Sequence, residues 1–222
     1  MHAEEFIRLA KVHPEVWTHI PFGPFPSTQS FITEFIEHFV RPNTGMCLYT
    51  VIDKTKPSTS VDPDGAFAGV LSYINTSKVN LVTELGFVMI FPEFQRTHVT
   101  SNACGLLLDY AFTPQSEGGL ALRRVQWQTN SRNHASVRAA ERMGFVKEGV
   151  LRWDRVIPGG RTAGKEWNGR SLRLKDGAES HFNEDDVGRD TVMLSLCWDD
   201  WFLEGKKENL TRRMAGVGLS SQ

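Results

Sequence analysis

Glu84 stands at the start of a predicted strand that is otherwise apolar, over residues 81–90 of this 222-residue chain. A carboxyl group in such a place loses contact with water, and this desolvation raises its pKa toward neutral pH. Glu84 is therefore a candidate general base, which removes a proton directly or through a water molecule. The alternative role is structural, with the carboxylate binding a loop amide or an arginine.

Strict alternation along this strand predicts two faces, one with Leu85, Phe87 and Met89 and the other with Glu84, Gly86 and Val88. Phe91-Pro92 ends the strand, because proline cannot donate to a strand ladder.

The polar turn after this strand leads into a helix that begins near Thr100 or Ser101 and ends before Pro114. Five apolar residues recur along the helix at helical spacing: Ala103, Leu106, Leu107, Tyr110 and Ala111. The free amides and positive dipole end of such a helix favour an anion, so the turn is a predicted phosphate site. An ordinary strand-loop-helix connection is the alternative.

A second strand-to-helix corner follows the predicted strand at 123–129. Asn133 can cap a helix that contains Ser136 in its first turn and ends at Gly144 in left-handed backbone. The predicted buried face of this helix holds Ala135, Ala139 and Met143.

The remaining elements must position these two corners. Hydrophobic periodicity predicts helices at 3–11 and 31–39, and strands at 46–52, 67–74, 146–157 and 191–196. A loop at 17–26 is rich in aromatic residues and proline, whereas Phe31, Phe35 and Phe39 of the second helix are predicted to be core rather than site.

Three polar segments complete the chain. Residues 53–65 form a predicted surface loop, and residues 204–222 a fraying helix and tail. The long insert at 158–188 has a basic first half and an acidic second half, which is typical of a solvated loop: Arg161, Lys165, Arg170, Arg173 and Lys175, then Glu179, Glu184, Asp185 and Asp186.

The composition indicates one domain over residues 1–222, with 40% apolar residues and a formal charge of -1. This charge gives no case for nucleic acid, and no apolar run has the length of a membrane span. Cys47, Cys104 and Cys197 are scattered, which favours reduced thiols and a cytoplasmic location. No metal-ligand spacing appears, so no metal is expected.

Five ordered motifs resemble the GCN5-related N-acetyltransferases, and most closely the branch of the ribosomal-protein-alanine acetyltransferases. The motifs are Glu84-Leu-Gly-Phe, Gln95-Arg-Thr, Asn133-x-x-Ser136 with Gly144-Phe145, Glu148-Gly149-x-x-Arg152, and Arg189-Asp190-Thr191-x-Met-x-Ser195. The resemblance implies an α/β fold in which helices flank a mixed, mostly antiparallel twisted sheet of six to seven strands, with a cleft between the two central strands.

The resemblance also implies transfer of an acetyl group from acetyl-CoA to a primary amine, which is a small molecule or a protein N-terminus, by direct attack on the thioester. The implied enzyme is a monomer or homodimer. The residues implied to bind the coenzyme are Phe87, Val88, Met89, Ile90, Gln95, Arg96, Thr97, His98, Val99, Thr100, Asn133, Ser136 and Arg138. Those implied to bind the acceptor are Trp17, Phe22, Phe25, Glu84, Trp127 and Trp153.

Ser136 resembles the family residue next to the coenzyme sulfur, where its hydroxyl can donate to the departing thiolate. The alternative is a hydroxyl that satisfies a backbone group of its own helix. The insert at 158–188 lies beside the acceptor site in the family, as a selector of substrate or a lid.

The phosphate turn departs from the family pattern, because His98 and Thr100 occupy positions usually held by glycine or alanine. The backbone amides survive this change, and the hydroxyls of Thr97 and Thr100 add donors. A second hypothesis follows from the departure, a catalytically degenerate protein of the same fold that binds acyl-CoA or a partner protein. A third, nucleotide binding through the turn alone, lacks a Walker lysine and magnesium ligands.

Overall fold

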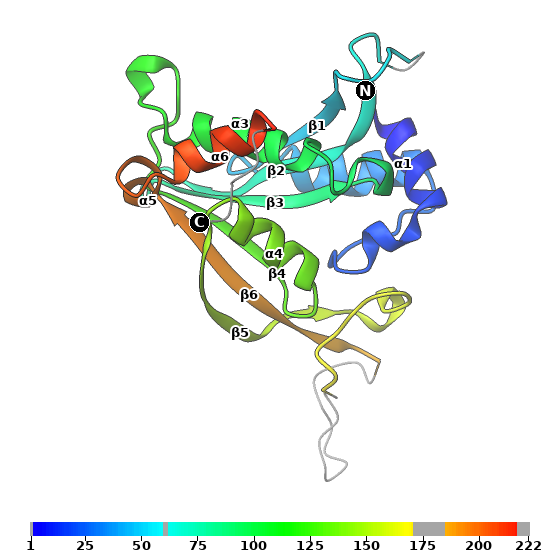
Figure 1. Ribbon diagram of the computed structural model, residues 1–222. Helices are drawn as coiled ribbons and strands as arrows, with labels where there is room; N and C mark the ends of the chain where they lie inside the picture. Colours follow the sequence, from blue (N-terminus) through cyan, green and yellow to red (C-terminus); the bar gives the residue numbers. More distant parts are fainter. Residues whose placement is uncertain (1, 60–61, 171–184, 217–222) are drawn as a thin grey trace.

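The computed structural model describes residues 2–59, 62–170 and 185–216 and contains a six-stranded twisted sheet (Figure 1). The strands are β1 (Cys47–Asp53), β2 (Ala66–Ser77), β3 (Val82–Ile90), β4 (Arg124–Asn130), β5 (Val146–Ile157) and β6 (Val187–Cys197), in the order β1-β2-β3-β4-β6-β5. Only the central pair, β3 and β4, is parallel. The predicted α/β fold and its six strands are confirmed.

Helices flank the sheet (Figure 1). The longer ones are α1 (Ala3–Val12), the π-helix η2 (Phe31–Val40), α3 (Val99–Phe112), α4 (His134–Arg142) and α6 (Lys206–Met214). Shorter turns are η1 (Pro14–Trp17), α2 (Thr28–Ser30), η3 (Pro92–Phe94), η4 (Gln115–Glu117), η5 (Gly159–Arg161) and α5 (Trp198–Phe202). Among the described residues no helix has the length and apolar character needed to cross a membrane.

The buried faces of α3 and α4 differ from the predicted ones. Leu106 and Tyr110 are largely exposed, while the residues that α3 buries are Val99, Cys104, Gly105, Leu108, Ala111 and Phe112. The reason is that α3 packs against α6 as well as the sheet, with Gly105 directly under Met214. On α4 the buried residue is Ala140, followed by Met143, whereas Ala135 is exposed.

Aromatic rings fill the space between the N-terminal helices and the sheet. Phe6 stacks on Phe31 with ring centroids 5.0 Å apart and meets Trp17 edge-on. Trp17 and Phe25 are both buried in this cluster. The aromatic loop is therefore anchored in the core on one side, which fixes the position of the rings that face outward.

The charge pattern of the insert before β6 predicted a solvated loop, but part of the insert is buried. Lys165 is only 8% exposed, and its Nζ donates to the carbonyl oxygens of Trp17 at 3.0 Å and Phe22 at 2.8 Å. Arg170 pairs with Asp190 at 2.8 Å. Lys165 and Arg170 thus bind partners in the folded core, and the prediction that Lys165 faces solvent was wrong because charge pattern does not reveal such partners. Four of the charged residues noted in the insert fall outside the described residues: Arg173, Lys175, Glu179 and Glu184.

The loop at 53–65 and the segment after β6 also have buried residues. Asp62 of the loop at 53–65 is buried against His2 at 2.8 Å, and its Oδ1 accepts from the amide of Asp64 in a turn. Near the C-terminus, α6 buries Leu210, and Trp201 of α5 is buried with its ring stacked on that of Phe112 in α3, 5.4 Å between centroids.

Candidate active site

A cleft opens where the two parallel central strands separate. β3 and β4 pair only from Val82 to Glu84, opposite Arg124 to Gln126. Beyond Glu84 the strands diverge and leave a cavity of about 360 Å³. This geometry confirms the predicted cleft between central strands and exposes unpaired strand backbone to a ligand.

A β-bulge in β3 shapes one wall of the cleft. Ser72 pairs with Gly86 and Val70 with Met89, so that Phe87 and Val88 together oppose a single residue of β2. Phe87 has a φ of +50°, the left-handed conformation that non-glycine residues rarely adopt. The bulge breaks the predicted alternation after Gly86, and as a result both Phe87 and Val88 line the cavity.

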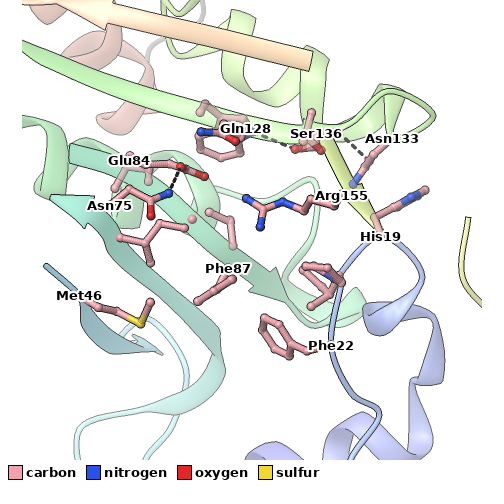
Figure 2. A pocket seen from close by; sticks show the side chains of 18 of the residues that line it. His19, Phe22, Met46, Asn75, Glu84, Phe87, Gln128, Asn133, Ser136 and Arg155 are labelled. Carbon is pink, nitrogen blue, oxygen red and sulfur yellow. Dashed lines mark hydrogen bonds between the residues drawn. The ribbon is translucent and has the colours of Figure 1, made fainter. Parts of the chain in front are cut away.

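Glu84 lies buried at the point of divergence, with 2% of its surface exposed. Asn75 Nδ2 donates to its Oε2 at 2.8 Å (Figure 2). Burial raises the pKa of Glu84 to about 7, against the opposing effects of the Asn75 bond and the charges of Arg155 and Arg189. A carboxyl group with this pKa can accept a proton near neutral pH.

Ser136 lies on the β4 side of the cavity (Figure 2). Trp127 Nε1 donates to Ser136 Oγ at 2.9 Å, and the Ser136 amide donates to Asn133 Oδ1 at 3.0 Å, which confirms the predicted cap of α4. Because the hydroxyl oxygen accepts from the indole, its own proton is left to donate elsewhere. Trp127 thus orients Ser136.

The turn at 95–100 is ordered by its own side chains. Gln95 Nε2 donates to the carbonyl of Ile90 at 2.8 Å. Thr97 Oγ1 donates to the carbonyl of Phe94 at 2.6 Å and accepts from the amide of Val99 at 3.2 Å. Arg96 has a φ of +60°, which bends the chain sharply before α3.

The amides at the start of α3 remain open to a ligand. Those of Thr100 and Ser101 have no hydrogen-bond partner among the described residues, as is usual in the first turn of a helix. His98, at a glycine position of the family, holds its Nε2 3.3 Å from Asp53 Oδ1 on β1. The turn therefore suits a phosphate despite the substituted glycines.

The structure brings together only part of the predicted site. The predicted residues that line the cavity are Phe22, Glu84, Phe87, Val88, Trp127, Asn133 and Ser136. Met89 and Ile90 are buried in the core, and Arg138 is exposed on α4. Trp17 and Phe25 lie in the aromatic core, while Trp153 covers Gly188 and donates its amide to Asp190.

Several residues of the cavity had no role in the sequence prediction: His19, Phe39, Asn75, Arg155 and Arg189. Phe39 was predicted as core, but it is 47% exposed and its ring lies 6.4 Å from that of Phe22. Arg189 belongs to a motif noted in the sequence, yet nothing in that motif showed that its side chain would be buried beside Glu84.

One group of possible metal ligands occurs among the described residues, formed by Cys197, Asp199 and Asp200. It lies at the start of α5, where Asp200 Oδ2 accepts from the amide of Cys197 at 2.8 Å. This arrangement is that of a helix cap.

Solved structures with the same architecture are acetyltransferases. A probable GNAT-family acetyltransferase from Chromobacterium violaceum has a TM-score of 0.66 and 28% identity, over 90% of this chain and 79% of that chain. A GCN5-related N-acetyltransferase from Brucella melitensis has a TM-score of 0.71 and 22% identity, over 99% and 80%. The spermidine N-acetyltransferase of Vibrio cholerae, solved with CoA and spermine, has a TM-score of 0.58 and 16% identity, over 90% and 92%.

The sequence model described as the Acetyltransferase (GNAT) domain matches residues 1–146, well over half of the chain. This chain therefore belongs to the GNAT acetyltransferase family. No curated protein sequence gives a match.

Proposed function

We propose that this protein is an acetyl-CoA-dependent N-acetyltransferase that modifies a primary amine by direct attack on the thioester. The observation that carries the proposal is the separation of β3 from β4 immediately after Glu84, with Ser136 on the opposite wall. This arrangement provides a base, a hydrogen-bond donor and free strand backbone around one cavity.

Each part of the cavity has a role in this reaction. Glu84, directly or through water, takes the proton of the attacking amine. The backbone at residues 87–90 binds the pantetheine arm and polarises the thioester carbonyl, and Asn133 binds the arm from the other side. When the C–S bond breaks, the Ser136 hydroxyl stabilises the thiolate by a hydrogen bond. The amides at the start of α3 bind the pyrophosphate.

Removal of one of these amides is expected to weaken the coenzyme complex. Thr100→Pro deletes an N–H in the first helical turn, where proline is tolerated, and we expect acetyl-CoA to bind about tenfold more weakly by calorimetry. Thr100→Ala keeps the amide and loses only the hydroxyl, so it is the matched control. Equal affinity of wild type and Thr100→Pro, with both folded to the same melting temperature, would remove this turn from the coenzyme site.

Ser136→Ala is expected to lower kcat about tenfold while the affinity for acetyl-CoA stays near that of the wild type. The physical reason is that the hydroxyl acts on the charge that develops at sulfur, which is absent in the bound ground state. The rate at which free thiol of coenzyme A is released gives kcat, and calorimetry gives the affinity for acetyl-CoA. A fully active variant shows instead that Ser136 only satisfies Trp127 Nε1.

The second candidate is a degenerate member of the family that binds acyl-CoA or a partner protein without turnover. The substitution of His98 and Thr100 for the family glycines favours it. Thioester consumption with a broad panel of small amines and peptide N-termini tests both candidates. Acetylated product with any amine supports the enzyme, whereas acetyl-CoA binding without product across the panel supports the degenerate protein.

Further features expected from the sequence stay predictions. They are the kinship with the ribosomal-protein-alanine branch, a small-molecule amine or a protein N-terminus as acceptor, a single domain, the cytoplasmic location, a monomer or homodimer, and catalysis without a metal. Arg138 of α4 as a ligand of the coenzyme and the insert before β6 as a selector of the acceptor are predictions of the same kind.

A further inference from the structure

Two arginines from neighbouring strands line the cavity. Arg155 comes from β5 and Arg189 from β6, and both line the same cavity as Glu84. Figure 2 shows the guanidinium of Arg155 extending into the space between Glu84, Ser136 and Phe87. Arg189 is only 5% exposed. Both residues lie beyond residues 1–146, so the match to the family gives no reason for them.

Neither guanidinium has its hydrogen bonds satisfied by the described residues. The Nε atoms of Arg155 and Arg189 are buried and have no hydrogen-bond partner. Arg155 Nε forms a long ion pair with Asp154 Oδ2 at 3.4 Å, and this oxygen also accepts from Thr191 Oγ1 at 2.7 Å. Arg189 makes one long bond of 3.5 Å to the carbonyl of His19. Apart from this long bond, no described residue accepts from the terminal N–H groups of the two guanidiniums, and both residues line the cavity, so these groups are left to donate to a ligand.

The charges around the cavity are predominantly positive. Among the described residues that line it, Glu84 is the one carboxylate, beside two arginines. Burial lowers the pKa of Arg189 to about 10, which leaves it protonated at neutral pH. A polycationic acceptor would meet two like charges here, whereas a carboxylate or phosphate matches the planar fork of a guanidinium.

We propose that the acceptor is a small amine that also carries an anionic group, a carboxylate or a phosphate, and that Arg155 and Arg189 bind this group while Glu84 faces the amine. The inference rests on the acetyltransferase function proposed above. The cavity of about 360 Å³ must also hold the acetyl end of the coenzyme, and this favours a small acceptor.

A panel of matched amines tests the proposal with the full-length wild-type protein and acetyl-CoA. The panel contains amino acids, the corresponding carboxamides and decarboxylated amines, aminoalkyl phosphates, and spermidine. We expect kcat/KM for an anionic acceptor to exceed that for its uncharged counterpart at least about tenfold, with spermidine the poorest. The carboxylate and phosphate arms show which anion the site takes.

Variants assign the preference to the two arginines. Arg155→Met and Arg189→Met keep an unbranched apolar stem and remove the guanidinium with its charge, and we expect each to reduce the preference at least about tenfold through KM of the anionic acceptor. Arg152→Met is the matched control, because Arg152 is exposed on the same strand and does not line the cavity. Arg155 has a half-exposed side chain, so its variant provides the test if Arg189→Met fails to fold.

The outcomes separate the two proposals. Turnover of amines without preference for an anionic group, or a preference that survives in both variants, overturns this inference and leaves the acetyltransferase intact. Absence of turnover with every amine overturns the acetyltransferase and this inference with it. A preference lost in the two cavity variants and kept in Arg152→Met supports the inference.

Discussion

Replacement of Glu84 by glutamine is expected to lower kcat/KM by about 10²–10⁴-fold, the usual contribution of a general base. Glutamine has nearly the same shape, and its carbonyl oxygen can still accept from Asn75 Nδ2. The wild-type rate should rise with pH through about 7, the value to which burial raises the pKa of Glu84. The variant should lose this limb of the profile. Glu34→Gln, an exposed carboxylate on η2, is the matched control.

The same substitution is expected to stabilise the fold at high pH. The pKa of Glu84 is raised from 4.5 to about 7, so the folded state binds this proton more tightly than the unfolded state. Stability associated with the protonated group is complete below the unfolded pKa and is lost as pH rises through the folded pKa. Above this window the buried charge costs about 3 kcal/mol, which glutamine avoids.

Thermal unfolding at two pH values measures this effect. Glu84→Gln should melt well above the wild type at about pH 8 and close to it at about pH 4, because the wild-type carboxyl is then protonated in both states. An active variant, or an equal stability difference at both pH values, would contradict the role assigned to Glu84.

Lys165→Met is expected to lower the free energy of unfolding by about 1–3 kcal/mol, the usual cost of one partly buried carbonyl left without a donor. Among the described residues the Phe22 carbonyl accepts from Lys165 alone, whereas the Trp17 carbonyl keeps the amide of Ile20 at 3.1 Å. Both carbonyls belong to the aromatic loop at 17–26. Lys165 Nζ also lies 6.0 Å from the centroid of the Trp17 ring. Methionine fills a similar volume, so packing changes little and the lost hydrogen bonds dominate.

The substitution should also weaken binding of the acceptor amine, because Phe22 lines the cavity. We expect KM for the amine to rise more than KM for acetyl-CoA. Denaturant unfolding and steady-state kinetics of both substrates provide the measurements, and Lys147→Met, on an exposed part of β5, is the control that should stay within about 0.5 kcal/mol of the wild type. Loss of stability equal to that of the control would mean that Lys165 does not anchor the loop.

The sequence was sufficient to predict the strands and helices of the two corners. Alternating and helical periodicity located all six strands, and Asn133 and Gly144 marked the ends of α4 because capping depends on local residue types. The place of Glu84 in an apolar strand predicted a desolvated carboxyl group, and the structure buries it; its role as a base is part of the proposed function.

The rest of the site depends on contacts between distant segments, which local pattern does not encode. The bulge at Phe87 depends on how β2 and β3 pair, and it defeats any strict alternation along β3. Lys165 appeared to belong to a solvated charge block until its partners, nearly 150 residues away, were in view. Arg155 and Arg189 line the same cavity as Glu84, although they come from β5 and β6, far along the chain from β3.

The proposed reaction requires that the cleft between β3 and β4 hold the reactive end of acetyl-CoA. A crystal structure of the wild-type protein with coenzyme A tests this requirement. We predict that the pantetheine arm lies between the bulge at Phe87 and Asn133, with its sulfur beside Ser136 Oγ and its pyrophosphate at the amides of Thr100 and Ser101. Coenzyme bound anywhere else on the protein, with this cleft empty, would contradict the account.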